Sequence, residues 1–239
     1  MSVSKIRVSA THLSGHSSSS LDLSVFIGTV VSAGPITMTA NLESLSGAIA
    51  IGTSESLAER PYGHRIVQLV ARGISENCAT WSSESAAHSS LTKINDEVFS
   101  EMALADRFHG MAAVASGIVI NQKLLGIFSV SGGPIWEIRN GYLIRQLDDI
   151  EGTSPDLTSP HFGGDADQTK RVSVEIDQIE TSRTFLVANR DCFDGISLDS
   201  VESIFRSQAS DLEAIEQIRL LLSPSSQTEL IQLLLVTIE

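Results

Sequence analysis

About ten short segments of the chain are apolar, either continuously or at alternate positions, and Gly, Ser, Asn or Pro residues separate them. This pattern is typical of β-strands with one or both faces buried. We therefore expect strands at residues 6–10, 23–31, 36–40, 48–51, 112–120, 124–130, 135–138, 171–176, 184–188 and 230–238. The Asn121-Gln122 and Asn140-Gly141 steps lie between apolar runs and predict hairpin turns, since Asn-Gly suits the positive φ angles of a two-residue turn.

Helical periodicity, with apolar residues three and four positions apart, occurs in four segments. We expect helices at residues 64–74, 91–105, 198–207 and 212–222. They fall in two pairs between groups of strands, and this order differs from the strict strand-helix alternation of a parallel sheet. The pattern predicts an α+β architecture in which helical pairs cover antiparallel sheets.

Length and charge narrow the class of protein. The chain has 239 residues, of which 42% are hydrophobic, so we expect a single domain over residues 1–239. Its 29 acidic and 16 basic side chains give a net charge of −13, which disfavours nucleic acid as a partner. Two cysteines are too few for a disulfide framework, which makes a reducing compartment the default.

No apolar run approaches the roughly 18 residues that a membrane-spanning helix needs, and the N-terminus lacks the apolar core of a signal peptide. We therefore expect a cytoplasmic protein without a membrane partner.

A polar segment, residues 11–22, follows the first expected strand, begins with Thr11 and ends with Asp22. In length and in these two end residues it resembles T-D-x-G-x-x-R-x-x-N-E-D, the opening motif of the metal-dependent protein phosphatases of the type 2C family. In this register Ser17 stands at the family's arginine. A second register stays open, because residues 28–32 are similar to the family's G-R-V-R-S, and it would remove Asp22 from the motif.

Three further segments carry the resemblance through the middle of the chain. Residues 48–51 lead into Gly52 and Thr53, where the family has the Asp-Gly pair whose Asp bridges two metals. Residues 95–99 and 110–115 are similar to a helix and a following G-M-G-T-T strand of compact bacterial members. Residues 124–147 are similar to the segment around the family's G-D-S-R, and Gly132 stands at its Asp.

The end of the chain completes the resemblance. Residues 183–190 are similar to R-x-L-L-L-C-S-D-G, with Asn189 in place of the Asp. Residues 229–236 are similar to D-N-x-T-V-V-V-V, which leaves Glu229 at the last metal-binding Asp. Between them, residues 151–170 read as a loop region that would correspond to a shortened flap subdomain.

The resemblance implies a central antiparallel β-sandwich flanked by helical pairs, with the flap reduced. In the family, two hard divalent cations held by oxygen ligands activate a water molecule and neutralise phosphate charge. Here Asp22, Asn189 and Glu229 would remain as a vestigial, weak metal site, and four further family positions would be degenerate, namely Ser17, Gly52, Thr53 and Gly132. We expect no catalytic residue and no cofactor, with a single weakly bound Mn²⁺ or Mg²⁺ as the alternative.

The three remaining polar residues also have structural interpretations. Asp22 suits a turn before a strand, Glu229 a solvated charge beside the last strand, and Asn189 a polar loop. His12 and His16 are four residues apart, but in an extended or loop region this spacing does not present both to one metal.

These observations lead to a functional hypothesis. We expect a degenerate phosphatase, a pseudophosphatase, that acts as a regulatory or protein-binding module with a kinase or a phosphoprotein as its partner. A divergent Mn²⁺- or Mg²⁺-dependent serine/threonine protein phosphatase is the alternative, and a subunit of an assembly is a third. The sequence predicts neither the partner's identity nor the oligomeric state.

Overall fold

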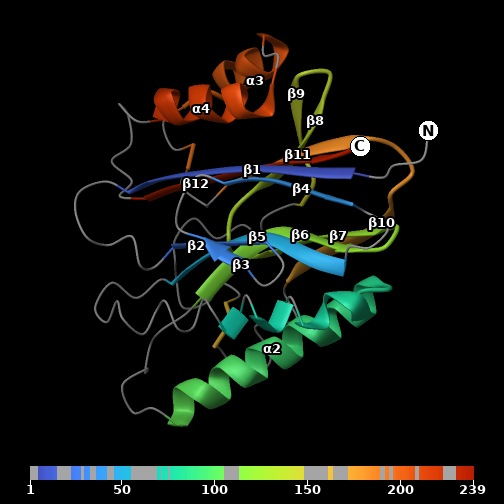
Figure 1. The fold of residues 1–239 in the computed structure, drawn as a ribbon. Coiled ribbons are helices and arrows are strands. Elements are labelled where there is room, and N and C mark those ends of the chain that lie inside the picture. Colours follow the sequence, from blue (N-terminus) through green and yellow to red (C-terminus); the bar gives the residue numbers. More distant parts are fainter. Residues whose placement is uncertain are drawn as a thin grey trace.

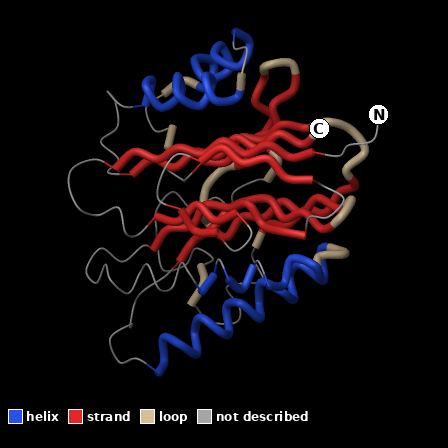
Figure 2. The backbone as a smooth tube through the Cα atoms, viewed as in Figure 1, coloured by secondary structure: helices blue, strands red, loops and turns tan. Residues whose placement is uncertain are grey.

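Two antiparallel β-sheets form the centre of the molecule and pack face to face (Figure 1). The computed structural model describes residues 5–14, 23–27, 30–32, 36–41, 46–54, 69–70, 72–74, 76–104, 113–147, 161–163, 172–188, 192–193, 196–207, 210–222 and 230–239. In residues 5–54 it describes the backbone alone. Figure 2 shows the two sheets as the inner layers and the helices as the outer layers.

Each sheet has six strands among the described residues. In sheet A the order is β4 (Ile36–Asn41), β1 (Lys5–Ser14), β12 (Leu230–Ile238), β11 (Arg183–Ala188), β8 (Ile135–Arg139) and β9 (Tyr142–Arg145). In sheet B it is β10 (Ser173–Gln178), β7 (Leu124–Val130), β6 (Ala113–Asn121), β5 (Ser46–Ser54), β2 (Leu23–Ile27) and β3 (Val30–Ser32). Every pair of neighbouring strands is antiparallel, so the predicted α+β sandwich is confirmed.

Two predictions about strands need correction. Residues 23–31, expected as one strand, form the hairpin of β2 and β3, in which Ile27 is opposite Val30. The apolar run is continuous in the sequence, and the one signal for its division is glycine at position 28, a residue type that favours turns. Strand β9 was absent from the list of expected strands, because its four residues are mostly exposed and show no apolar alternation, although the hairpin turn predicted at Asn140-Gly141 implies a strand after it.

The buried side chains form three layers, because strand residues alternate between the two faces of each sheet. In β6, Ile118 and Ile120 point between the sheets, whereas Val119 points toward helix α2 (Glu84–Leu104). A third cluster lies between sheet A and the pair α3 (Leu198–Ser207) and α4 (Asp211–Leu222). Figure 1 shows α2 below sheet B and α3 with α4 above sheet A.

Local sequence signals explain where two of the helices begin. The Ser83 hydroxyl accepts a hydrogen bond from the Ala86 N–H and caps α2. At the start of α4 the Ser210 hydroxyl accepts a hydrogen bond from the Glu213 N–H, which caps the helix, and donates to the Glu213 carboxylate. The backbone is also helical at residues 69–70, 72–74 and 76–77, which supports the predicted helix 64–74 in its described part. None of the helices in the described part of the chain is long and apolar enough to cross a membrane.

The predicted flap region, residues 151–170, lies outside the described residues except for positions 161–163. There Phe162 is buried and pairs with Ala113 at the start of β6. The buried Asn95 side chain on α2 accepts a hydrogen bond from the Gly163 N–H at 2.8 Å. This contact joins the segment to the helix that covers sheet B.

Candidate functional site

At one end of the sandwich, a short loop connects one sheet to the other. Strand β7 of sheet B leads through residues 131–134 into β8 of sheet A. Ser131 bridges to Ala115 at the start of β6, and the Ala188 N–H donates to the Pro134 carbonyl at 3.2 Å. The loop therefore contacts the last residue of β11. We call this end of the sandwich the crossover end.

The crossover loop lies directly on the backbone of β6. A Cβ atom added to Gly132 would lie 2.2 Å from the carbonyl carbon of Ala115 and 2.3 Å from the backbone nitrogen of Ser116. Separations below about 3.0 Å do not occur for real Cβ atoms. Only glycine fits at position 132 in this conformation of the loop.

Two serine side chains lie beneath the crossover loop. Ser116 and Ser129 are opposite each other in β6 and β7, and the alternation of both strands turns them toward sheet A. The Ser129 hydroxyl donates to the Gly133 carbonyl at 3.3 Å. Within the described part of the chain, the buried Ser116 hydroxyl has no hydrogen-bond partner. An unpaired buried hydroxyl is costly, so this position is a point of local polar strain.

Gly52 and Thr53 belong to strand β5 near the crossover end. Gly52 is opposite Ser24 on one side and Ala115 on the other, and Thr53 is opposite Leu23 and Val114. The backbone at both positions is thus paired with β2 on one side and with β6 on the other.

The remaining predicted site residues, Ser17, Asp22, Asn189 and Glu229, lie outside the described residues. Three described strand ends are next in sequence to three of these residues. Leu23 follows Asp22, Ala188 precedes Asn189, and Leu230 follows Glu229. Ala188 contacts the crossover loop, and β12 begins at Leu230, three residues before Leu233, the partner of Ala188. Leu23 pairs with Thr53 beside the start of β6. The topology therefore brings these three strand ends to the crossover end.

We asked whether the described residues of the crossover end could hold a pair of divalent cations, which prefer carboxylate oxygens. Residues 131–134, Gly52 and Thr53 supply no carboxylate. In the parts of the chain that the structure describes, no group of three or more His, Cys, Asp or Glu residues is arranged to hold a metal ion. The described residues alone do not fit a two-metal centre.

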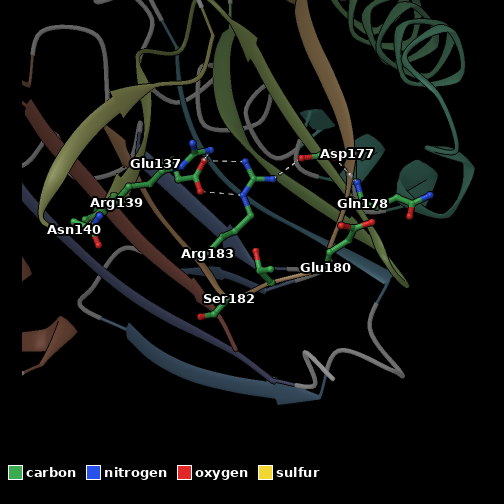
Figure 3. Close-up of a pocket in the computed structure, with 10 residues that line it drawn as sticks. Glu137, Arg139, Asn140, Asp177, Gln178, Glu180, Ser182 and Arg183 are labelled. Carbon is green, nitrogen blue, oxygen red and sulfur yellow. Dashed lines mark hydrogen bonds and ion pairs between the residues drawn. The ribbon is translucent and has the colours of Figure 1, made fainter. Parts of the chain in front are cut away.

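An open groove of about 710 Å³ lies at the opposite end of the sandwich (Figure 3). Its walls are residues 137–140 of β8 and the following turn, and residues 177, 178 and 180–183 between β10 and β11. Arg183 begins β11 opposite Ile238, the last residue of β12, which places the groove far from the crossover loop along the same strands.

The groove is built on a buried ion pair. Glu137 and Arg183 have side-chain exposures of 6% and 11%. The Arg183 Nε and Nη2 atoms donate to the two Glu137 carboxylate oxygens at 3.2 and 2.9 Å, and the Arg139 Nη2 donates to the same carboxylate at 2.6 Å. The Arg183 Nη1 reaches Asp177 of β10 at 2.8 Å, so the network joins the two sheets. Figure 3 shows the Arg183 guanidinium between Glu137 and Asp177.

The two arginines determine the charge state of Glu137. Burial acts to raise its pKa, but the hydrogen bonds and positive charges of Arg139 and Arg183 prevail and lower the pKa of Glu137 below its usual range. The same hydrogen bond raises the pKa of Arg139. Glu137 is therefore an ionised carboxylate at neutral pH.

This network was not predicted from the sequence. Its signal is Glu137 in the apolar strand segment Ile135-Trp136-Glu137-Ile138, since a buried acidic side chain requires a cationic partner. The sequence alone does not identify that partner, because Arg183 lies 46 positions later.

No model of a protein family matches the sequence, and no curated protein matches it. Solved structures match almost the whole chain. The serine/threonine phosphatase PstP/Ppp of Mycobacterium tuberculosis is 12% identical with a TM-score of 0.71, and the match covers 98% of this chain and 99% of that one.

Two further structures show the same similarity. PppA, a key regulatory component of T6SS in Pseudomonas aeruginosa, is 11% identical with a TM-score of 0.67 and 99% coverage of both chains. The catalytic domain of the serine/threonine protein phosphatase PstP in complex with 2 manganese ions is 12% identical with a TM-score of 0.68, and the match covers 98% of this chain and 99% of that one.

The manganese complex corrects one of our expectations. We expected no cofactor, with a single weakly bound Mn²⁺ or Mg²⁺ as the alternative. This expectation is wrong, because a structural neighbour over nearly the whole chain was solved with 2 manganese ions, which points to metal cofactors.

The backbone of this chain superposes on these phosphatase structures over nearly all of its length, with TM-scores of 0.68 and 0.71. The resemblance stated from sequence motifs is therefore confirmed at the level of architecture. This chain has the fold of the metal-dependent serine/threonine protein phosphatases of the type 2C family.

Proposed function

We propose that the protein is a pseudophosphatase: it keeps the phosphatase fold, does not hydrolyse phosphoesters, and acts in the cytoplasm as a regulatory module that binds a protein partner. The observation that carries this proposal is the packing of Gly132 against β6.

At position 132 the resemblance places an Asp of the family's G-D-S-R core. The atoms that a side chain would meet there are backbone atoms of Ala115 and Ser116, and β6 is held between β5 and β7. Rotation of a neighbouring side chain cannot relieve such a conflict. This packing supports a function that uses no carboxylate at position 132.

Strand β5 supports the same proposal. Where the resemblance places the metal-bridging Asp, this chain has Gly52, with Ser24 and Ala115 opposite it in the sheet. A two-metal centre uses its bridging carboxylate to hold both cations at once. Without a carboxylate at position 52, β5 would not supply the group that would hold both cations and support metal-assisted hydrolysis.

A kinase or a phosphoprotein is the partner class that we propose. The partner class follows from the resemblance to phosphatases, and the regulatory role from an analogy of fold, since PppA, which shares this fold, is a key regulatory component of T6SS. The proposal concerns hydrolysis and places no condition on metal binding, because a structural neighbour holds 2 manganese ions.

The alternative function is a divergent Mn²⁺- or Mg²⁺-dependent serine/threonine protein phosphatase that uses Asp22, Asn189 and Glu229. One observation favours it. The strand ends next to these positions, Leu23, Ala188 and Leu230, all lie at the crossover end.

A phosphate-release assay separates the two functions. The substrate is a phosphothreonine peptide at millimolar Mn²⁺, with PstP/Ppp of Mycobacterium tuberculosis as the positive control. We expect the wild-type protein to release phosphate no faster than buffer with Mn²⁺. Mn²⁺-dependent release that both Asp22→Ala and a chelator abolish would establish the alternative.

Calorimetry then tests metal binding separately from hydrolysis. Mn²⁺ is titrated into metal-stripped wild type and into Asp22→Ala. Saturable binding that the substitution removes would place Asp22 in a metal site even where hydrolysis is absent.

A further inference from the structure

We propose that the groove at residues 137–140 and 177–183, together with the adjoining exposed face of the β8–β9 hairpin, is a docking surface for a basic segment of a partner protein. Cationic side chains of the partner pair with Asp177 and Glu180, and apolar side chains cover Tyr142 and Ile144. This surface is independent of phosphoester chemistry, because it lies at the end of the sandwich opposite the crossover loop.

The groove continues into an exposed apolar face. Ile144 is opposite Glu137 and Tyr142 is opposite Arg139, so both lie beside residues of the groove wall. Tyr142 and Ile144 are 55% and 39% exposed. Leu143 between them packs instead with the cluster under α3. The hairpin thus presents two apolar side chains outside the core next to a polar groove, a combination found at binding sites.

The charges in the groove are not equivalent. Arg183 uses Nε, Nη1 and Nη2 in bonds to Glu137, Asp177 and Gln146. Both arginines share the one buried carboxylate of Glu137. In contrast, the Asp177 side chain is 63% exposed, and no described residue forms an ion pair with the exposed Glu180. The two accessible carboxylates favour a cationic partner.

The net charge of the whole chain also favours a cationic partner. A net charge of −13 attracts basic partners and repels acidic ones during approach. The groove itself carries three carboxylates and two guanidinium groups, so it does not reverse this preference locally. Arg139 remains able to bind a carbonyl or carboxylate of the same segment, because only its Nη2 is used by Glu137.

The geometry favours docking through side chains rather than the addition of a strand. Strand β9 is the outer strand of sheet A, but its Leu143 N–H already donates to the Glu202 side chain of α3 at 2.9 Å. An added strand would have to displace this carboxylate. The hairpin is also held in place by Arg206, whose guanidinium lies 5.1 Å from the centre of the Tyr142 ring. A surface held in advance loses less entropy on binding.

The test uses a fluorescein-labelled peptide of alternating arginine and leucine, with glycine at both ends, and the same peptide with glutamate in place of arginine. Anisotropy is measured against the full chain at about 0.15 M salt, where the screening length is about 8 Å. We expect saturable binding of the arginine peptide and none of the glutamate peptide. No saturation at millimolar protein would overturn the proposal.

Substitutions locate the binding. Glu180→Gln and Ile144→Ser each change a side chain without an ion pair in the described structure, and we expect each to weaken binding about fivefold to tenfold, or roughly 1–1.4 kcal/mol. The matched control is Asp96→Asn with Glu97→Gln on the exposed face of α2, which we expect to change the affinity less than twofold. Equal weakening by the control would mean attraction to the whole acidic chain and would refute the docking surface.

Sedimentation tests the other occupant, a second copy of this chain. A dimer that Ile144→Ser dissociates, combined with no effect of that substitution on peptide binding to the monomer, would overturn the proposal and assign the hairpin face to self-association.

Discussion

Glu137 shows how one buried charge can join two sheets. Its carboxylate lies on β8, accepts from Arg183 on β11 and from Arg139 on its own strand, and Arg183 continues to Asp177 on β10. A buried pair of this kind contributes little compared with an apolar pair, but removing one partner leaves an uncompensated charge. The network therefore serves mainly to fix how the sheets meet at the groove.

The first prediction concerns acid stability. Because the pKa of Glu137 is lower in the folded state, its contribution is fully present above the unfolded value, near 4.5, and is lost as the pH falls through the folded value. We expect Glu137→Gln to lower the free energy of unfolding by about 2–3 kcal/mol at pH 7 and by less near pH 3.5. Urea unfolding at both pH values measures this, with Asp96→Asn as the exposed control. Parallel losses at the two pH values would contradict it.

The second prediction concerns the packing of the Trp81 ring against Gly126. A Cβ atom at Gly126 would lie 2.7 Å from Cε3 of the fully buried Trp81, whose ring also packs edge-on against Phe128. We expect Gly126→Ala to cost about 1–3 kcal/mol of unfolding free energy. In a Trp81→Phe background the same substitution should cost less, because the smaller ring leaves room. Strict additivity in this double-mutant cycle would refute the packing argument.

The resemblance nominated candidate site residues only where the family has local motifs, and these residues stay predictions. Among them are Gly52, Thr53 and Gly132, and the structure adds that the backbone of β6 leaves no room for a side chain at Gly132. The partnership of Glu137 with Arg183 could not be predicted, because it depends on strands that are adjacent in sheet A but distant in sequence.

At the scale of elements, the β8–β9 hairpin illustrates how a turn sequence determines a surface. Asn140 and Gly141 have φ angles of 53° and 80°, as a two-residue turn between antiparallel strands requires. Gly141 also lies against Arg206 of α3, where an added Cβ atom would be 2.4 Å from Arg206 Cγ. The turn and the helix thus position the hairpin together.

The third prediction follows from these two constraints. We expect Gly141→Ala to lower the free energy of unfolding by about 1–2 kcal/mol, through backbone strain and contact with Arg206. Asn140→Gly, the matched control, removes no contact that the turn needs and should be nearly neutral. In the Gly141→Ala background, Arg206→Ala should restore the part of the unfolding free energy that is lost through contact with the Arg206 side chain. Thermal unfolding of the three variants and the wild type measures both parts, and an Asn140→Gly loss as large as that of Gly141→Ala would contradict the assignment.

Elements with a strong period were predictable, and those defined by their neighbours were not. Strands β7 and β12 and helix α3 have the predicted bounds, because their apolar runs end at clear polar residues. The β2–β3 hairpin was missed because pairing, not polarity, divides its apolar run. Strand β9 was missed because it exists as a strand through its pairing with β8.

At the scale of the whole molecule, stability should decline from the centre of each sheet to its edges. Strands β6 and β12 lie between other strands, and the described side chains of both are mostly buried. The edge strand β9 is half exposed and has one neighbour. This contrast separates regions that open only on global unfolding from regions that open locally.

The fourth prediction is measured by amide hydrogen exchange. We expect the amides of β6 and β12 to exchange slowest, near the rate set by global unfolding, and those of β9 to exchange much faster. The outward amide of Leu143 is the exception within β9, because it is bonded to Glu202. Glu202→Ala should remove its protection while leaving β6 unchanged. Protection of all β9 amides equal to that of β6 would disprove the gradient.

The overall architecture could be predicted because many weak motifs occur in the right order along the whole chain. The 10–12% identity to the solved phosphatases leaves few positions in common, so each motif alone carries little weight. Order and spacing depend on the fold and not on the chemistry of the site, and they survive when single residues change. For the same reason they predict the architecture better than the reaction.

The close contact of Gly132 with β6 also has a consequence for the history of such a protein. A substitution that introduces an acidic side chain there collides with the backbone until the loop or the strand has first shifted. Such a shift brings no benefit by itself, so the two changes are useful only in combination. Selection acting on single substitutions would then rarely place a carboxylate at this position, and descendants of the chain would diversify through surfaces elsewhere on the sandwich.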